Sequence, residues 1–249
     1  MSSAHLRFYA ELNDFLPHCR RQVTFVHAFA ARVSAKDLIE SLGVPHTEVD
    51  LILVNGESRD FAYHVKDKDR VSVYPVFESM DIRPLLQLRP QPLRETKFVL
   101  DVHLGRLAVY LRMLGFDSLY SNNNPDEKLA QVSFRQKRIL LTRDRGLLKR
   151  SLVTHGYWVR ETRPRQQLLE ILRRFDLYGS IRTFQRCMKC NGHLRPVDKH
   201  LIAERLPRHT QETRDEFQHC PECDRIYWKG SHYERMLGFL GRLVRQNSS

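Results

Sequence analysis

Four cysteines are arranged in two pairs with the spacing of a metal site: Cys187 with Cys190, and Cys220 with Cys223. A CxxC pair presents two thiolates from one tight turn, and two such turns supply the four ligands of a tetrahedral zinc. Bound metal contributes folding free energy that so short a segment lacks. Two disulfides are the alternative, but no pattern typical of a secretory signal precedes the cysteines, so we expect zinc. We therefore predict a structural zinc ribbon, which by itself does not define a function.

Three aspartates lie where strands of a parallel sheet are expected to end or a helix to begin. Asp101 directly follows the apolar run 97–100, Asp144 lies just beyond the run 138–141, and Asp126 begins a predicted helix. In such sheets the site lies beyond the carboxyl ends of the strands. Carboxylates that converge there repel one another unless a hard cation such as Mg²⁺ or Mn²⁺ lies between them. This pattern is typical of a metal-dependent phosphodiesterase.

Each aspartate also has a purely structural interpretation. Asp126 follows a proline and could serve only as a helix N-cap, and Asp144 could be only a turn residue. Asp101 ends a strand that should be buried, where an unpaired carboxylate is costly. We therefore expect Asp101 to be the most informative of the three.

Basic and aromatic side chains near these positions are candidates for nucleic-acid contact. Five of them surround Asp144 or follow Asp101 and could hold phosphates, although each could equally be a solvated surface charge. Tyr227 and Trp228, beside Lys229, could stack on bases or pack over the zinc knuckle. The five basic candidates are Arg106, Arg143, Arg145, Lys149 and Arg150.

Charge is unevenly distributed along the 249 residues. Residues 1–80 hold 9 Lys and Arg against 11 Asp and Glu, whereas residues 81–249 hold 32 against 18. The basic part is expected to bind a polyanion, most often nucleic acid, with a generally basic surface as the alternative. No apolar run reaches the roughly 18 residues of a membrane span, so we expect a cytoplasmic protein without a membrane partner.

The first 80 residues predict a small domain of strands around one helix. Strands are expected at 5–9, 22–26, 49–54 and 70–74, with a helix from Ser34 to Gly43. The order ββαββ resembles a β-grasp, ubiquitin-like domain. Carrier proteins of that fold need a free Gly-Gly end, which is missing here because the last strand continues into the chain. A binding or docking role towards a protein partner is what remains.

The rest of the chain divides at a proline-rich stretch. Residues 81–96 contain Pro84, Pro90 and Pro92 and are predicted to be a linker. Strands then alternate with helices, which predicts an α/β domain with a parallel sheet over residues 97–178. Residues 179–249 are assigned to the zinc ribbon and a C-terminal helix over 233–246.

Two motifs carry a family resemblance. The stretch from Phe98 to Asp117, with Asp101, and the stretch from Ile139 to Leu148, with Asp144, resemble the prokaryotic Mut7-C RNase domain, a branch of the PIN-like nucleases. The paired CxxC is similar to the ribbon of that family, and the N-terminal segment resembles the ubiquitin-like domain often fused to it. His103 departs from the family pattern close to Asp101.

The resemblance implies a PIN-like three-layer α/β/α domain and acidic ligands for Mg²⁺ or Mn²⁺ at Asp101, Asp126 and Asp144. We accordingly predict a ribonuclease that hydrolyses RNA phosphodiester bonds and carries one structural Zn²⁺. The alternative from another class is a non-catalytic adaptor that binds RNA or the ribosome. A phosphatase with a nucleophilic Asp101 would need a second acid at position 103, which is His103.

Overall fold

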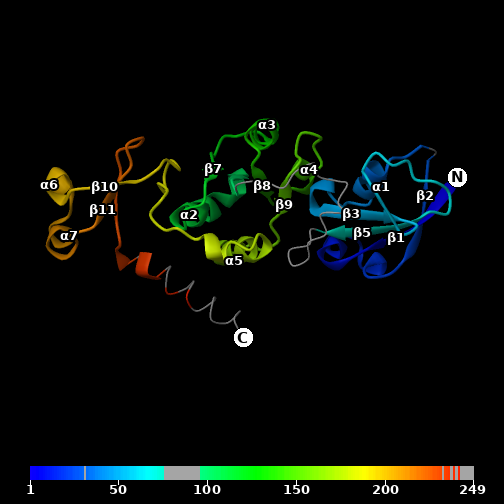
Figure 1. The fold of residues 1–249 in the computed structure, drawn as a ribbon, viewed down its shortest axis with the longest axis horizontal. Coiled ribbons are helices and arrows are strands. Elements are labelled where there is room, and N and C mark those ends of the chain that lie inside the picture. Colours follow the sequence, from blue (N-terminus) through cyan, green and yellow to red (C-terminus); the bar gives the residue numbers. More distant parts are fainter. Residues whose placement is uncertain (31, 76–95, 232, 236–237, 239–240, 242–249) are drawn as a thin grey trace. The chain divides into compact units, whose positions relative to one another are not determined.

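A computed structural model describes residues 1–30, 32–75, 96–231, 233–235, 238 and 241 (Figure 1). These residues form two compact units, residues 1–104 with 120–162 and residues 105–119 with 163–249. Most of the predicted linker and the predicted C-terminal helix lie outside the described residues. No helix of the described part is long and apolar enough to cross a membrane.

The N-terminal region is a five-stranded sheet with the order β2-β1-β5-β3-β4, against which α1 packs. β1 pairs antiparallel with β2 and parallel with β5, as in a β-grasp domain. Leu38 and Ile39 of α1 are buried with Leu6 and Ile52 of the sheet in one apolar core. The elements are β1 (Ser2–Phe8), η1 (Ala10–Phe15), η2 (His18–Arg20), β2 (Phe25–Phe29), α1 (Ala35–Ser41), η3 (His46–Glu48), β3 (Val49–Val54), β4 (Glu57–Arg59) and β5 (Arg70–Pro75).

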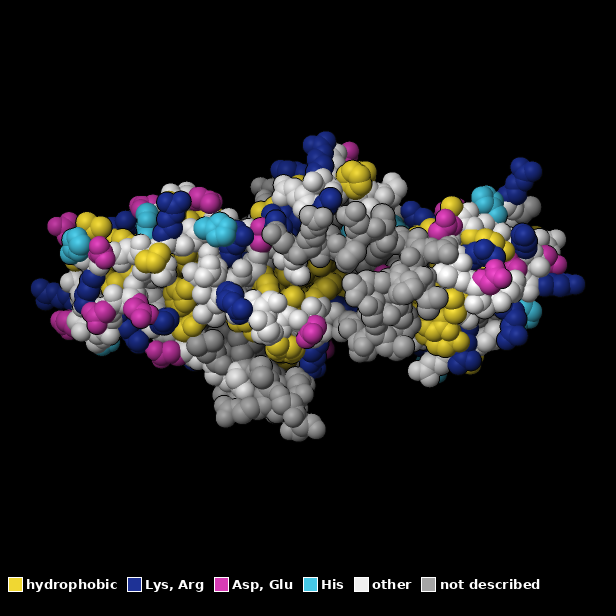
Figure 2. Space-filling view, in the orientation of Figure 1, with side chains coloured by type: hydrophobic (Ala, Val, Ile, Leu, Met, Phe, Trp, Pro, Cys, Tyr) yellow, Lys and Arg dark blue, Asp and Glu magenta, His cyan; other side chains and the backbone are white. Residues whose placement is uncertain are grey.

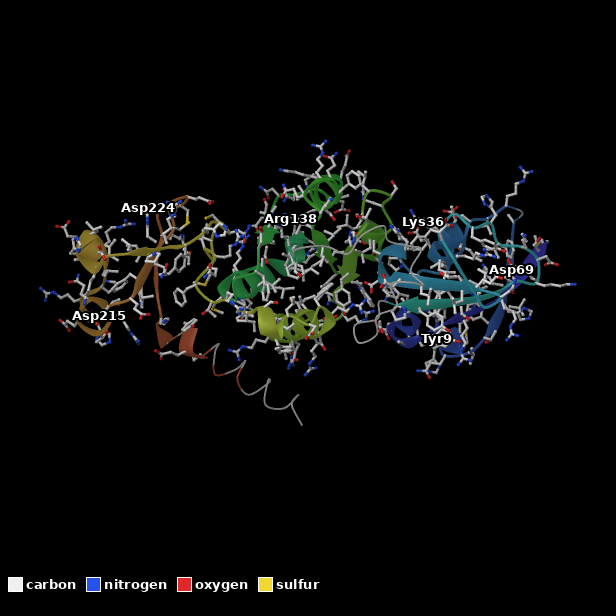
Figure 3. All side chains as sticks on the ribbon, viewed as in Figure 1. Tyr9, Lys36, Asp69, Arg138, Asp215 and Asp224 are labelled. Atoms are coloured by element: carbon white, nitrogen blue, oxygen red, sulfur yellow. The ribbon has the colours of Figure 1, made fainter. Side chains whose placement is uncertain are left out.

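Local signals explain the boundaries of these elements. The Ser34 side chain accepts a hydrogen bond from the Asp37 N–H at 3.0 Å and caps α1, as its sequence predicts. Asn55 and Gly56 both have positive φ, which is what a two-residue hairpin turn between β3 and β4 requires. Asp69, labelled in Figure 3, precedes β5 and ties the chain together there, because its carboxylate accepts hydrogen bonds from Asn55, Tyr63 and Lys66.

Two expectations for this region need correction. The second strand begins at Phe25 instead of at residue 22, because Gln22 adopts a left-handed φ of 56° and its N–H is held by the Asn13 side chain. The short strand β4 was not predicted, so that the order is ββαβββ. Three residues with no apolar alternation give little sequence signal for a strand.

The second sheet has four strands in the order β7-β6-β8-β9, in which β8 pairs in parallel with both β6 and β9. Its strands are short and its central strands, β6 and β8, are fully buried, as expected for a parallel sheet. Within the first unit, α3 packs on β6 and β8, and α4 packs on β8 and β9. The elements are β6 (Phe98–Leu100), η5 (Val102–Leu104), β7 (Ser118–Tyr120), α3 (Asp126–Gln136), β8 (Ile139–Thr142), α4 (Arg145–Leu148) and β9 (Gly156–Trp158).

The second unit combines two helices with a small three-stranded sheet. The helices α2 and α5 pack together, and the antiparallel sheet has the order β10-β11-β12. A small core of Ile202, Leu206 and Phe217 lies under this sheet. The elements are α2 (Gly105–Met113), α5 (Pro164–Arg174), η6 (Tyr178–Ser180), β10 (Arg195–Val197), α6 (Lys199–Ile202), η7 (Ala203–Arg205), α7 (Arg208–Thr213), β11 (Phe217–His219) and β12 (Ile226–Trp228).

Candidate active site and metal centre

Asp101 and Asp144 meet at one side chain, Thr142, at the carboxyl end of β8. The Thr142 hydroxyl donates to Asp101 Oδ2 at 2.7 Å and accepts from the Asp144 N–H at 2.9 Å. Asp101 follows β6, the parallel neighbour of β8, and its side chain is buried as predicted. The expected edge of the sheet therefore holds these two aspartates together.

Asp144 also has a structural role, as a helix cap instead of the turn residue that the sequence left open. It is the N-cap of α4, where its Oδ1 accepts from the Gly146 N–H at 2.7 Å. Its Oδ2 and the Oδ1 of buried Asp101 accept no hydrogen bond from the described residues. Two carboxylate oxygens at one strand edge are thus left for a ligand.

Asp126 begins α3 and is not its cap, because Pro125 holds the N-cap position. Its carboxylate lies 3.9 Å from the Arg150 guanidinium, and both side chains are about half exposed, which makes a weak surface pair. Among the described residues, no group of three or more His, Cys, Asp or Glu ligand atoms lies within 4.8 Å of one another except the four cysteines. The three aspartates are therefore not gathered into one compact cluster. His103, in η5, is exposed.

Three of the five basic candidates hold the polypeptide around Asp144. Arg143 Nη1 donates to the carbonyl oxygens of residues 159, 160 and 161, beyond the end of β9. The Arg145 guanidinium carbon lies 3.9 Å from the centroid of the Trp158 ring. Lys149 Nζ donates to the Glu40 carbonyl oxygen at 2.8 Å. Burial, followed by the charge of nearby Arg160, lowers the pKa of Arg145.

Exposure separates the remaining two basic candidates from these three. Arg106 on α2 and Arg150 after α4 are exposed. On the face seen in Figure 2, Lys and Arg side chains are interspersed with Asp and Glu instead of forming one patch. Net charge thus does not by itself indicate where a polyanion would bind on this face.

The four predicted zinc ligands converge. Cys187 Sγ lies 3.4 Å from Cys223 Sγ, Cys190 Sγ lies 3.4 Å from Cys220 Sγ, and all four sulfurs lie within 4.8 Å of one another. Four sulfurs at ~2.3 Å from a tetrahedral zinc would be about 3.8 Å apart, so the donor set and its size fit this ion. All four cysteines are free thiols, which excludes the two-disulfide alternative in this structure.

The two CxxC turns repeat one backbone geometry. In the first, the Asn191 N–H donates to the Cys187 carbonyl, and in the second the Asp224 N–H donates to the Cys220 carbonyl. Asn191 and Asp224 both have positive φ, a conformation that Asn and Asp tolerate better than most residues. Each turn therefore holds its two cysteines with the same backbone geometry.

The Tyr227 hydroxyl lies 3.1 Å from Cys187 Sγ, so Tyr227 packs over the knuckle, one of its two predicted roles. Burial alone would raise the pKa of this thiol. Hydrogen bonds from the Tyr227 hydroxyl and from backbone N–H groups outweigh it and lower the pKa of Cys187 to about 6. A thiolate is therefore favoured at neutral pH, which is the form that binds zinc.

A buried arginine that the sequence did not single out joins α2 to the first knuckle. Arg112 is 3% exposed, and its Nη1 donates to the carbonyl oxygens of Met188 and Lys189 at 3.1 and 2.9 Å. Its Nε donates to the Ser118 carbonyl oxygen at 2.8 Å. Burial lowers the pKa of this guanidinium, and the nearby cysteines oppose that effect. Its position in an amphipathic helix gave no sign of this role, because the acceptors are backbone atoms far along the chain.

Asp117 makes a second link of the same kind. Its carboxylate accepts from Asn191 Nδ2 at 2.8 Å and pairs with Arg186 at 3.4 Å, and both partners belong to the first knuckle. Asn191 Oδ1 also accepts from the Ser118 N–H at 2.9 Å. The turn after α2 and the zinc knuckle are thus one hydrogen-bonded structure.

A pocket of about 320 Å³ opens beside this knuckle, within the second unit. Three of its lining residues are aromatic side chains that could face a ligand: Trp228, and Phe184 with Tyr233, whose rings meet edge to face with centroids 4.8 Å apart. Arg186 and Ser231 add polar atoms to its lining. The remaining lining residues are Met113, Met188, Leu194, Ile226, Tyr227 and Gly230.

Comparison with known proteins identifies both regions. Residues 96–240 match the family model described as the Mut7-C RNAse domain, and residues 1–81 match the model described as Mut7-C ubiquitin. Among curated proteins, no relative matches this chain. The crystal structure of SAMP1 from Haloferax volcanii matches with 14% identity and a TM-score of 0.26, over 32% of this chain and 100% of that one.

Proposed function

The chain belongs to the Mut7-C RNAse domain family, and from that premise we propose that it is a metal-dependent ribonuclease that hydrolyses RNA phosphodiester bonds. The observation that carries the proposal is the convergence of Asp101 and Asp144 on Thr142 at the carboxyl edge of two parallel strands. Burial of a carboxylate is costly for stability, and the carboxyl ends of parallel strands are where ligands bind in such sheets.

We propose that Asp101 and Asp144 hold Mg²⁺ or Mn²⁺, with Asp126 as the third and least secure ligand. The donor chemistry fits, because each of the first two has a carboxylate oxygen without a hydrogen bond from the described residues. Magnesium in nucleotide-cleaving sites is commonly bound by one or two carboxylates together with substrate phosphate. When bound, the ion supplies a water nucleophile and stabilises the leaving oxygen.

The protein's own residues have separate tasks in this proposal. Thr142 orients Asp101 through the hydroxyl that it donates, and it fixes the N–H of Asp144 at the same time. Exposed Arg106 and Arg150 are assigned to phosphate contact, because their guanidinium groups remain accessible to solvent. Arg143, Arg145 and Lys149 keep the loop in place, and any phosphate contact by them would be secondary.

The ribbon is assigned a structural zinc, and the pocket beside it an unpaired base. Several aromatic side chains in the lining of a pocket of this size suit the flat face of a base, which stacks on aromatic rings in many proteins that bind single-stranded RNA. Phe184 and Trp228 are the side chains on which we base this assignment.

The test is cleavage of labelled single-stranded RNA by the purified chain with Mn²⁺, with Mg²⁺ and with a chelator. Cleavage that requires the divalent ion supports the proposal. RNA binding without cleavage under all three conditions would favour the second candidate, a non-catalytic RNA- or ribosome-binding adaptor.

A further inference from the structure

Residues of the β-grasp region form hydrogen bonds with the chain segment that follows Asp144. Both belong to the same compact unit. Lys149 Nζ donates to the Glu40 carbonyl oxygen at 2.8 Å, just beyond α4. His46 Nε2 lies 2.8 Å from the carbonyl oxygen of Val153, in the loop between α4 and β9. The loop after Asp144 is therefore fixed at two points by α1 and η3.

Trp158 connects the two regions most directly. Its indole Nε1 donates to the Arg143 carbonyl oxygen at 3.2 Å, one residue before Asp144, and its ring lies under the Arg145 guanidinium. The same ring contacts Phe15 of η1 with centroids 5.0 Å apart and packs against the β-grasp core. The residues on both sides of Asp144 thus rest on one side chain, which the β-grasp region supports.

Charged side chains reinforce this contact. Glu48 Oε1 accepts from the Trp158 N–H at 2.5 Å, and Arg160 donates to the Asp14 carboxylate at 2.9 Å. Burial opposes the charge on Arg160, but Glu48, Tyr157 and Asp14 together more than offset it, so that the pKa of Arg160 is raised. Glu48 is fully buried and lies 3.8 Å from the Arg160 guanidinium, so separating the two regions would leave its charge without this partner.

We propose that the β-grasp domain is a structural part of the nuclease site, in which Phe15 and Trp158 are positioning residues for the loop that carries Asp144. The loop needs such support because α4 has only four residues, too few to be stable on its own. The expected effect on RNA cleavage rests on the proposed nuclease function. The expected support of the loop does not depend on that function. It gives the N-terminal domain an intramolecular task in place of, or in addition to, binding another protein.

The test compares Phe15→Leu with Phe25→Leu in the full chain. Both changes remove an aromatic ring that packs in the same β-grasp core, but the ring of Phe25 contacts Phe8 and Arg20, both in the β-grasp domain. Hydrogen exchange of the Gly146 amide, which is bonded to Asp144, should be at least tenfold faster in Phe15→Leu than in Phe25→Leu. In RNA cleavage, Phe15→Leu should lower kcat about tenfold with little change in KM, whereas Phe25→Leu should change neither.

Equal exchange at Gly146 in the two variants and in the unchanged protein would overturn the inference. Should Phe15→Leu fail to fold, Trp158→Phe serves instead, because it keeps a ring beneath Arg145 and removes only the indole N–H that holds Arg143. Faster exchange at Gly146 is again expected, and unchanged exchange would refute the role of Trp158. If no RNA is cleaved by any form, the proposed function fails, and the exchange measurement still decides the structural claim.

Discussion

Replacing Thr142 with valine should separate the two roles of its hydroxyl from its packing. Thr142 is fully buried, and valine keeps its volume while removing both the donor to Asp101 and the acceptor for the Asp144 N–H. A hydrogen bond to a charged group contributes about 1.5–3 kcal/mol, and a partly buried N–H left without an acceptor adds about 1 kcal/mol. We expect the free energy of unfolding to fall by about 2–4 kcal/mol.

Trp158 offers a local probe for this measurement, because it lies opposite Thr142 in the β8–β9 register. The chain has two tryptophans, so urea unfolding followed by fluorescence in a Trp228→Phe background reports on Trp158 alone. The matched control is Thr142→Ser, which keeps the hydroxyl and loses only a buried methyl group, at a cost of about 1 kcal/mol. In RNA cleavage, Thr142→Val should lower kcat about 10- to 100-fold, since ~1.4 kcal/mol corresponds to tenfold.

The reasoning would be refuted if Thr142→Val were as stable and as active as Thr142→Ser. That result would mean that the hydroxyl neither orients Asp101 nor holds the start of α4. A loss of stability with full activity would leave Thr142 a structural residue and would separate it from the proposed site.

Further predictions concern the second unit. Cys187→Ser should abolish binding of one zinc per chain, because only three thiol ligands remain, and zinc retained by the variant in elemental analysis would contradict this. Arg112→Met should weaken zinc binding at least tenfold by freeing the knuckle carbonyls, as measured by chelator competition. Arg182→Met should leave zinc binding unchanged, because in the described part of the chain that guanidinium donates to the carbonyl oxygens of Gly179 and Ile181. Trp228→Ala should weaken binding of single-stranded RNA by about 1–3 kcal/mol if a base stacks in the pocket, as measured by fluorescence anisotropy, and equal loss with fully paired RNA would argue against base recognition.

Patterns of residue type were sufficient to predict most of the fold. The apolar run 49–54 gave β3 with the observed bounds, and Ser34 precedes and caps α1 as expected. The true start of β2 escaped prediction because it depends on the left-handed Gln22 and on the bond that its N–H donates to the Asn13 side chain, and β4 escaped because its three residues show no apolar alternation. The parallel sheet, the β-grasp region and the convergence of the four cysteines are confirmed.

The site was harder to predict than the fold. Proximity to a strand end correctly suggested that Asp101 and Asp144 lie together, but neither Thr142 as their link nor Arg112 as the support of the knuckle was visible in the sequence. Both depend on contacts between segments distant along the chain, which residue type and spacing do not encode. For the same reason, the basic residues around Asp144 suggested phosphate contacts, while Lys149 donates to a β-grasp carbonyl.

The central claim is that Asp101 and Asp144 carry metal-dependent cleavage of RNA. The most direct test is single-turnover cleavage of labelled RNA with Mn²⁺ by the unchanged protein and by the Asp101→Asn/Asp144→Asn variant, after purification steps that exclude a contaminating nuclease. We predict that the variant loses cleavage, keeps its fold, and binds RNA as well or more tightly, because two negative charges near the phosphate are removed. Cleavage by the variant at an undiminished rate would contradict the assignment.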